Sequence, residues 1–354
     1  MGLSTSFSAS FLLLLVLGLF VADGQQVPAL FIFGDSIFDV GNNNNLFTFI
    51  KSNFPPYGRD FDTRLPTGRF CNGKLASDII AAEYLGFTSY PLAYLSREAT
   101  GENLLIGANF ASAASGYFDA TADLYHAIPL SQQLEYYREY KPRLVEIAGR
   151  SNASTIISGA LYLLSAGSSD FLQNYYIDPL LQVAYSFDRF SEILIQSYSN
   201  FIQRLYALGA RRIGVTSLPP IGCLPAAITI FGLGGNQCVG RLNKDAVSFN
   251  NRLNATSQRL KNRLSGLKLV VFDIYQPLLN LSTDPTANGF FEARRACCGT
   301  GLLETSILCN PFSVAAGTCA NASDYVFWDG FHPTEAANRI LARTLSDSGY
   351  VLVT

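Results

Sequence analysis

Five short apolar runs spread along this chain favour an α/β architecture. Each run is short and rich in aliphatic or aromatic residues, as buried strands are. The predicted strands are Ala29–Phe33, Leu104–Phe110, Ala160–Ala166, Arg212–Ser217 and Lys268–Ile274. Segments with helical apolar spacing lie between them, at Lys74–Leu85, Ser131–Ala148, Phe187–Leu208 and Arg241–Leu264. Strands separated by helices favour right-handed crossovers, so we expect a parallel sheet covered on both faces.

The composition fits one large globular unit. Of 354 residues, 49% are hydrophobic and 15% are charged, which is ample apolar content for a core. We see no internal repeat and no linker after the first residues, and we therefore predict a single domain over residues 25–354. The formal net charge is −2 and no basic run stands out, so nucleic acid is a poor candidate partner.

Residues 1–24 have the pattern of a secretory signal peptide. The apolar run Phe11–Val21 is shorter than a membrane-spanning helix, and small residues follow it at Ala22 and Gly24. No Lys or Arg precedes the run, which leaves a signal anchor as the alternative. No second long apolar stretch follows, so we expect no stable membrane insertion. The predicted location is extracellular, in the apoplast or cell wall if this is a plant protein.

A serine follows the first predicted strand at a turn. Gly34 lets the backbone turn, and Asp35 and Ser36 come next. Side chains at the carboxyl end of a strand in an open α/β sheet face the crevice where ligands bind, which makes Ser36 a candidate nucleophile. For an isolated Gly-Asp-Ser, ordinary turn and N-cap chemistry is the alternative.

A second polar motif, Trp328–Glu335, stands near the end of the chain. A serine hydroxyl needs a base to remove its proton, and His332 suits that role when a third group orients it. Asp329, three residues earlier, can reach the other ring nitrogen across a tight turn. A capping or surface histidine is the alternative. The other histidine, His126, lacks the Pro-Thr-Glu that follows His332 and is predicted to be an ordinary loop residue.

Four ordered motifs carry a family resemblance: FGDSxxDxGNNN, NFASAASG, GSSD and DxxHPTE. They occupy Phe33–Asn44, Asn109–Gly116, Gly167–Asp170 and Asp329–Glu335. In these motifs the sequence resembles the plant-type GDSL esterase/lipase family, within the SGNH hydrolase superfamily. The resemblance runs from about Val27 to the end of the chain. It implies a flavodoxin-like, three-layer α/β/α fold with a five-stranded parallel sheet.

The resemblance also implies roles for individual residues. Ser36 would be the nucleophile, His332 the base and Asp329 its partner. The backbone N–H groups of Ser36 and Gly116 would form an oxyanion hole, with residue 169 as the third donor. The family usually has Asn there, whereas this chain has Ser169, whose hydroxyl ends nearer the backbone. Because such a donor contributes about 3 kcal/mol, we expect a weakened oxyanion hole.

Two further polar residues, Asp170 and Asn174, lie in or near the third motif. Asp170 is expected to hold the turn of that motif rather than to take part in the chemistry. Asn174 follows closely in sequence, and the sequence leaves open whether its amide can reach the oxyanion.

The cysteines and glycosylation motifs fit an oxidising compartment. The seven cysteines lack paired C-x-x-C spacing and nearby histidines, so we predict disulfides rather than a zinc site. We expect a Cys223–Cys238 bridge and at most two bridges among Cys297, Cys298, Cys309 and Cys319, and the odd count leaves at least one unpaired thiol. Candidate N-glycosylation sites are Asn152, Asn254, Asn280 and Asn321.

Other chemistries find little support. The sequence has no G-x-S-x-G, HExxH, P-loop or GxGxxG motif, and two histidines cannot form a three-histidine zinc site. Asp35 and Asp39 flank the serine, but such residues more often cap turns than bind a metal. We therefore expect neither a metal nor another cofactor.

The predicted function is hydrolysis of a carboxylic ester by a secreted serine esterase or lipase, through an acyl-enzyme intermediate. The substrate would be a small-molecule, lipid or polysaccharide ester, and the loops that choose among these cannot be interpreted from sequence. Two alternatives remain: an acyltransferase that uses the same residues, and a non-catalytic secreted glycoprotein that binds a lipid or cell-wall ligand. Ser169 is the main support for the latter.

Overall fold

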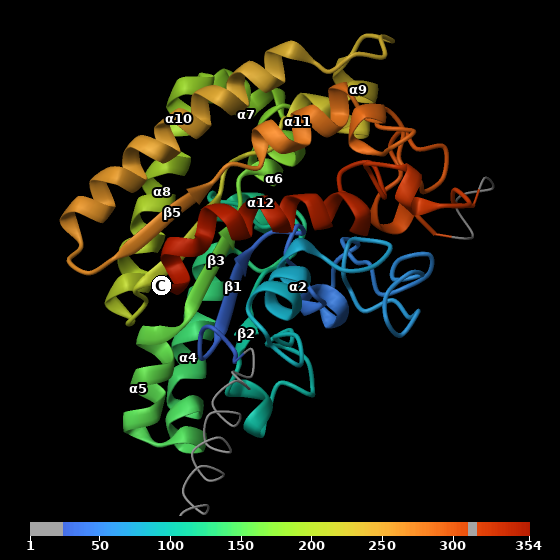
Figure 1. The fold of residues 1–354 in the computed structure, drawn as a ribbon. Coiled ribbons are helices and arrows are strands. Elements are labelled where there is room, and N and C mark those ends of the chain that lie inside the picture. Colours follow the sequence, from blue (N-terminus) through green and yellow to red (C-terminus); the bar gives the residue numbers. More distant parts are fainter. Residues whose placement is uncertain (1–23, 311–316) are drawn as a thin grey trace, which may run out of the picture.

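The computed structural model describes residues 24–310 and 317–354, and Figure 1 shows their fold. The predicted signal peptide, apart from Gly24, lies outside the described residues. At the centre is a five-stranded, fully parallel sheet with the strand order β2-β1-β3-β4-β5. Its strands are β1 (Leu30–Gly34), β2 (Gly107–Asn109), β3 (Leu161–Ser165), β4 (Arg212–Thr216) and β5 (Lys268–Phe272). This is the flavodoxin-like order, and the prediction of a five-stranded parallel sheet is confirmed.

Helices cover both faces of the sheet, which completes three layers (Figure 1). On one face of the sheet, helix α12 packs on β4 and β5 and also against α2. On the other face, α4 packs on β1 and α10 packs on β5, and α8 contacts both of these helices. Every residue of β1 and β3 is buried because both faces are covered, and this explains their unbroken apolar runs. The α-helices are α2 (Ala76–Ile79), α3 (Asp119–Asp123), α4 (Leu130–Ala148), α5 (Arg150–Gly159), α6 (Ser168–Asp170), α7 (Pro179–Ala184), α8 (Phe187–Ala207), α9 (Pro225–Phe231), α10 (Gly240–Arg263), α11 (Tyr275–Thr283) and α12 (Glu335–Val353).

Short helices of other types connect these elements. Two are single π-helical segments, η2 (Ile80–Tyr84), which continues α2, and η4 (Phe171–Tyr175), which continues α6. The 3₁₀ turns are η1 (Asn42–Asn45), η3 (Gly101–Leu104), η5 (Ile221–Cys223), η6 (Thr286–Asn288), η7 (Ser306–Leu308) and η8 (Ala322–Asp324).

Strand β2 is shorter than the predicted run Leu104–Phe110. Leu104 belongs to η3 instead, and pairing with β1 starts at Gly107. Gly107 has φ +100°, and a side chain there would meet the carbonyl oxygen of Leu30 at 2.1 Å. The backbone therefore enters the sheet at a position that only glycine tolerates, and the apolar residues before it pack outside the strand.

Three disulfides connect the loops, and the predicted Cys223–Cys238 bridge is one of them. The remaining pairs are Cys297–Cys319 and Cys298–Cys309, whereas Cys71 is a buried free thiol. The backbone N–H of Cys298 donates to the carbonyl oxygen of Trp328 at 2.8 Å. Two of the bridges therefore brace the segment that leads into Asp329.

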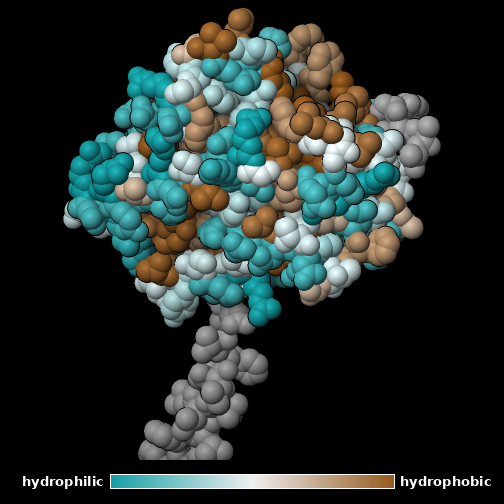
Figure 2. All heavy atoms as spheres, turned by 90° about the horizontal axis from the view of Figure 1, so that it is seen from above, coloured by the Kyte–Doolittle hydropathy of each residue, from teal (hydrophilic) through white to brown (hydrophobic). Residues whose placement is uncertain are grey.

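Within the described ranges, no helix is both long and apolar enough to cross a bilayer. Figure 2 shows hydrophilic residues over much of one face, with hydrophobic residues gathered in patches between them. The exposed large hydrophobic side chains include Leu302, Leu303, Ile307 and Leu308, in the loop that precedes Asp329.

Candidate active site

Ser36 stands in a tight turn at the carboxyl end of β1. Gly34 ends the strand with φ +125°, and a side chain there would overlap the carbonyl oxygen of Ser165 at 1.8 Å. The side chain of Gln133, from α4, bonds both backbone groups of Gly34 at 2.8 Å. Asp35 then starts the turn, and its carbonyl oxygen accepts from the N–H groups of Phe38 at 3.2 Å and Asp39 at 3.0 Å. The serine is therefore presented on a rigid backbone, and its side chain is only half-buried.

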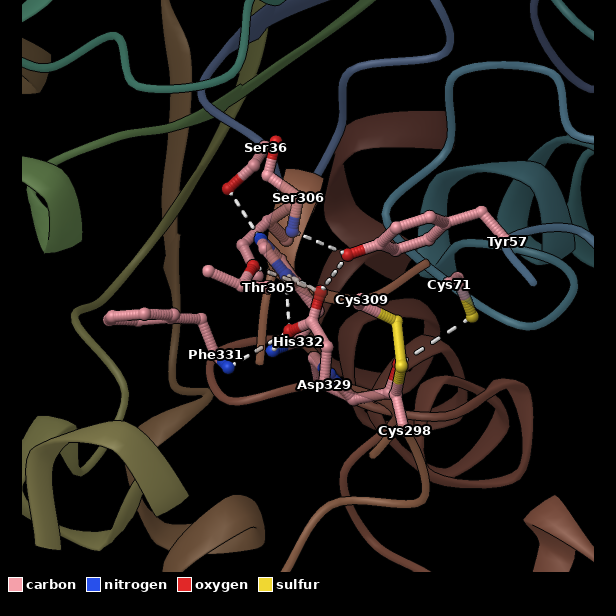
Figure 3. A network of polar contacts seen from close by, with 12 residues as sticks. Ser36, Tyr57, Cys71, Cys298, Thr305, Ser306, Cys309, Asp329, Phe331 and His332 are labelled. Carbon is pink, nitrogen blue, oxygen red and sulfur yellow. Dashed lines mark hydrogen bonds and ion pairs between the residues drawn. A yellow bond between two sulfur atoms is a disulfide. The ribbon is translucent and has the colours of Figure 1, made fainter. Parts of the chain in front are cut away.

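The structure brings His332 to Ser36 although 296 positions separate them. The ring nitrogen Nε2 of His332 lies 2.7 Å from Ser36 Oγ (Figure 3). A tight turn holds the histidine, because the N–H of Trp328 donates to the carbonyl oxygen of His332 at 2.7 Å. The aromatic ring of Phe70 packs on the imidazole, with 5.0 Å between ring centroids. The turn and the Phe70 ring thus fix the position and the orientation of the imidazole.

Asp329 orients the imidazole from its other side. Its carboxylate oxygens lie 2.7 and 2.9 Å from Nδ1 of His332, and the carboxylate is fully buried. A carboxylate only accepts hydrogen bonds, so Nδ1 carries a proton and Nε2 is left free to accept from the serine hydroxyl. The N–H groups of Phe331 and His332 also donate to Asp329 Oδ1, each at 2.9 Å. The three residues form a continuous hydrogen-bonded chain.

Two hydrogen-bond donors to Asp329 were not predicted from the sequence. The hydroxyl of Tyr57 donates to Asp329 Oδ2 at 2.7 Å, and that of Thr305 donates to the same oxygen at 3.1 Å (Figure 3). Tyr57 in turn accepts from the N–H of Ser306 at 2.8 Å. Burial and the adjacent carboxylate raise the pKa of Tyr57 well above its ordinary value, so it remains a neutral donor. No local pattern marks a tyrosine 272 positions from its acceptor.

A small cavity opens beside the serine. Its volume is about 30 Å³, and its wall includes Ser36, His332 and Ser169, the residue at the expected third oxyanion position. Neither Ser36 N–H nor Gly116 N–H donates to another residue within 24–310 or 317–354. Gly116 is not part of the cavity wall but lies against Asp170, whose carboxylate oxygen a side chain at 116 would meet at 2.1 Å. Among the described residues, both of these backbone donors are thus without a partner.

Asp170 and Asn174 are engaged in structural bonds. The Asp170 carboxylate accepts from the Tyr117 N–H at 2.7 Å and from the Thr121 hydroxyl at 2.7 Å, which ties the segment just after the second motif to the third motif. The amide of Asn174 donates to the same Thr121 hydroxyl at 3.0 Å, and Asn174 does not line the cavity. In this structure the Asn174 amide thus bonds to Thr121 and lies outside the cavity wall.

The acidic residues around the serine cap turns. Asp39 accepts from the N–H groups of Gly41 and Asn42 at 2.8 Å and of Ala113 at 2.9 Å, and Asp35 accepts from Ile37 N–H at 3.2 Å. In the part of the chain that the structure describes, no three His, Cys, Asp or Glu side chains are grouped as metal ligands would be.

Buried carboxyl groups near the serine are expected to make stability depend on pH. Burial raises the pKa of Asp35 to about 7, of Asp170 to about 7 and of Asp39 to about 6, from an ordinary 3.8. At pH values between 3.8 and about 7, the folded protein therefore binds more protons than the unfolded chain. The stability that these protonated carboxyl groups give the folded protein is complete below their pKa in the unfolded chain, and it is lost as the pH rises through their pKa in the folded protein. We expect denaturant titrations to give a lower free energy of unfolding at about pH 8 than at about pH 5.

The isosteric variant Asp35→Asn isolates one of these groups. Its side-chain oxygen can still accept from Ile37 N–H, but it does not titrate. We expect the free energy of unfolding of this variant to fall less steeply with pH than that of the wild type. Identical slopes in the two proteins would contradict the assignment.

The remaining candidate positions lie on the surface. His126 is exposed and lies outside the cavity wall. The side chains of Asn152 on α5, Asn254 on α10, Asn280 on α11 and Asn321 before η8 are all exposed, so each sequon is accessible to modification.

Comparison with known proteins identifies the family. The family model described as GDSL-like Lipase/Acylhydrolase matches residues 30–345. Two Arabidopsis thaliana proteins, each named as a GDSL esterase/lipase, are 68% and 62% identical over 330 residues; these cover 92% and 93% of this chain and 90% and 93% of the relatives. The Arabidopsis thaliana GDSL esterase/lipase APG is 58% identical over 351 residues, 98% of this chain and 99% of the relative. The resemblance inferred from four motifs is confirmed, and the chain belongs to the GDSL-like lipase/acylhydrolase family.

Proposed function

We propose that this chain is a secreted serine esterase or lipase that hydrolyses carboxylic esters through Ser36, His332 and Asp329. The hydrogen-bonded chain from Ser36 Oγ through the imidazole to Asp329 is the observation that carries the proposal. The names of its relatives, esterase/lipase, support the same reaction class. Three disulfides, four exposed sequons and the pattern of residues 1–24 support secretion.

The proposed reaction proceeds in two acyl-transfer steps. Ser36 Oγ bonds to the ester carbonyl carbon while its proton moves to His332 Nε2, and the carbonyl oxygen gains the negative charge. His332 then gives that proton to the leaving alcohol as the ester C–O bond breaks, which leaves an acyl-serine. Water then attacks the acyl carbon while its proton moves to His332 Nε2, the bond between Ser36 Oγ and the acyl carbon breaks as His332 returns the proton to Ser36, and the carboxylic acid departs. Asp329 stabilises the imidazolium that forms in both steps.

A second cavity suggests where the acyl group binds. It also measures about 30 Å³ and shares Ile37, Pro219, Leu224 and Phe331 with the cavity beside the serine. Its remaining wall is mainly apolar and includes Leu278 of α11. A space of this size is comparable to that of one water molecule in the liquid, so we propose that short acyl chains fit best. The exposed side chains of Leu302, Leu303, Ile307 and Leu308 lie in the segment whose Thr305 bonds to Asp329, and they offer a surface for the rest of an apolar substrate.

Purified protein is expected to react stoichiometrically with a fluorophosphonate at Ser36 and to hydrolyse p-nitrophenyl acetate faster than the palmitate ester. Peptide mass spectrometry locates the label, and initial rates give kcat/KM for each ester. Absence of labelling and of hydrolysis would favour the non-catalytic ligand-binding alternative. Acyl transfer to an added alcohol in preference to water would favour the acyltransferase.

A pair of leucine variants tests the acyl site. Leu278→Ala enlarges the second cavity, so the relative rate on longer acyl chains should rise. Leu281→Ala is the matched control, because Leu281 is equally buried on the same helix but does not line the cavity. Each truncation costs about 2–5 kcal/mol of stability, so only the change in chain-length preference distinguishes them. The same preference in both variants would exclude this acyl site.

A further inference from the structure

A second amide-bearing residue shares the cavity with Ser36 and Ser169. Gln173 lies one turn beyond Ser169, where α6 continues into η4, and it forms part of the wall of the same cavity of about 30 Å³. The hydroxyl of Tyr125 donates to the carbonyl oxygen of Gln173 at 2.7 Å, which fixes the backbone there. The chain therefore has an amide at the cavity, displaced by four residues from the position where the family usually has Asn.

The carboxamide of Gln173 has no partner among the described residues. Its Oε1 is buried without a hydrogen bond, and its Nε2 donates to no residue within the described ranges. Burying an unpaired amide is costly, and such groups in folded proteins are few. The adjacent Asn174 differs, because its amide is bonded to Thr121. Of these two neighbouring residues, the one whose amide is unpaired is the one that lines the cavity.

We propose that Gln173 supplies the side-chain hydrogen bond to the oxyanion in this chain, a role that rests on the proposed ester hydrolysis. Its N–H would donate to the carbonyl oxygen as negative charge develops there, together with the N–H groups of Ser36 and Gly116. A half-turn about the terminal side-chain torsion exchanges its oxygen and NH₂ group, so the amide can present a donor. Gln173 has two methylene groups and extends further than Ser169. No proton is transferred to or from the amide.

Kinetics of Gln173→Ala on p-nitrophenyl acetate test this role. Loss of one oxyanion donor lowers kcat by about 10²-fold or more, because the interaction exists only when the charge develops, and KM should change little. Gln196→Ala is the control, since Gln196 is exposed on α8 and, within the described part of the chain, its side chain bonds only to Asn200. Thermal unfolding checks that each variant is folded.

The variant Ser169→Asn provides a rescue. Asn at position 169 would return a donor to the usual place, so Gln173→Ala should cost less than about tenfold in the Ser169→Asn background. Full kcat in Gln173→Ala would overturn the proposal, and so would a rise in KM at unchanged kcat or an undiminished loss in the double variant.

Failure of the proposed function has a different signature. In that case the wild-type protein would neither hydrolyse the ester nor be labelled at Ser36, and the role of Gln173 would fall with it. If the wild type is active and Gln173→Ala keeps the same kcat as the Gln196→Ala control, the ester hydrolysis stands and only the role of Gln173 is rejected.

Discussion

Ser36→Ala is expected to lower kcat for a short aryl ester by about 10⁵-fold or more while the protein stays folded. The substitution removes the atom that would bond to the acyl carbon, so no acyl-enzyme can form. Only one hydrogen bond, from the serine hydroxyl to His332, is lost on the protein side. The side chain is half-buried, and the turn is held by Gly34 and Asp35 rather than by the hydroxyl. Ester hydrolysis with the purified variant, together with its thermal unfolding, measures both effects.

A serine far from the site provides the control. Ser265 is exposed in the loop that precedes β5, at the amino edge of the sheet, so Ser265→Ala should keep the activity and fluorophosphonate labelling of the wild type. Wild-type turnover in Ser36→Ala would falsify the proposed mechanism. Loss of activity with unchanged labelling would instead show that the probe reacts with another residue.

Asp329→Asn is expected to lower kcat by about 10⁴-fold. The Asp329 carboxylate accepts from the imidazole, from Tyr57 and Thr305 on one oxygen and from two backbone N–H groups on the other. An amide has only one acceptor oxygen, so its NH₂ group must face either the two backbone N–H groups or the two hydroxyls, and the imidazole Nδ1 lies within 2.9 Å of both positions. Where it faces the imidazole, Nδ1 must accept and Nε2 carries the proton. His332 then carries its proton on Nε2, the nitrogen that faces Ser36, so it cannot accept the proton of the serine hydroxyl.

The outcome is measured as kcat at saturating ester, with unfolding as a check. The matched control is Asp324→Asn in the same C-terminal segment. Among the described residues its exposed side chain bonds only to Asn321, and the kcat of this variant should be unchanged. A kcat within tenfold of the wild type in Asp329→Asn would argue that Asp329 does not orient the base. Equal losses in both Asn variants would point to disturbance of the segment instead.

The sequence was sufficient for the sheet and for most of the long helices because their patterns are local. Continuous apolar runs such as Ala160–Ala166 contain the strands, since a strand buried on both faces needs no polar alternation. The predicted helix Phe187–Leu208 differs from α8 by one residue at its end, where Gly209 adopts φ +114°. The pairing of Ser36 with His332 was also foreseeable, because each lies in a short motif whose chemistry requires the other.

Folding alone decided the contacts between distant residues. Tyr57 meets Asp329 across 272 positions, Cys297 pairs with Cys319 rather than with another of the four late cysteines, and Gln173 rather than Asn174 lines the cavity. The local spacing of residues predicts which face of a strand or helix a side chain occupies. It does not predict which loop packs against that face, because that depends on how the whole chain fills the space around the sheet.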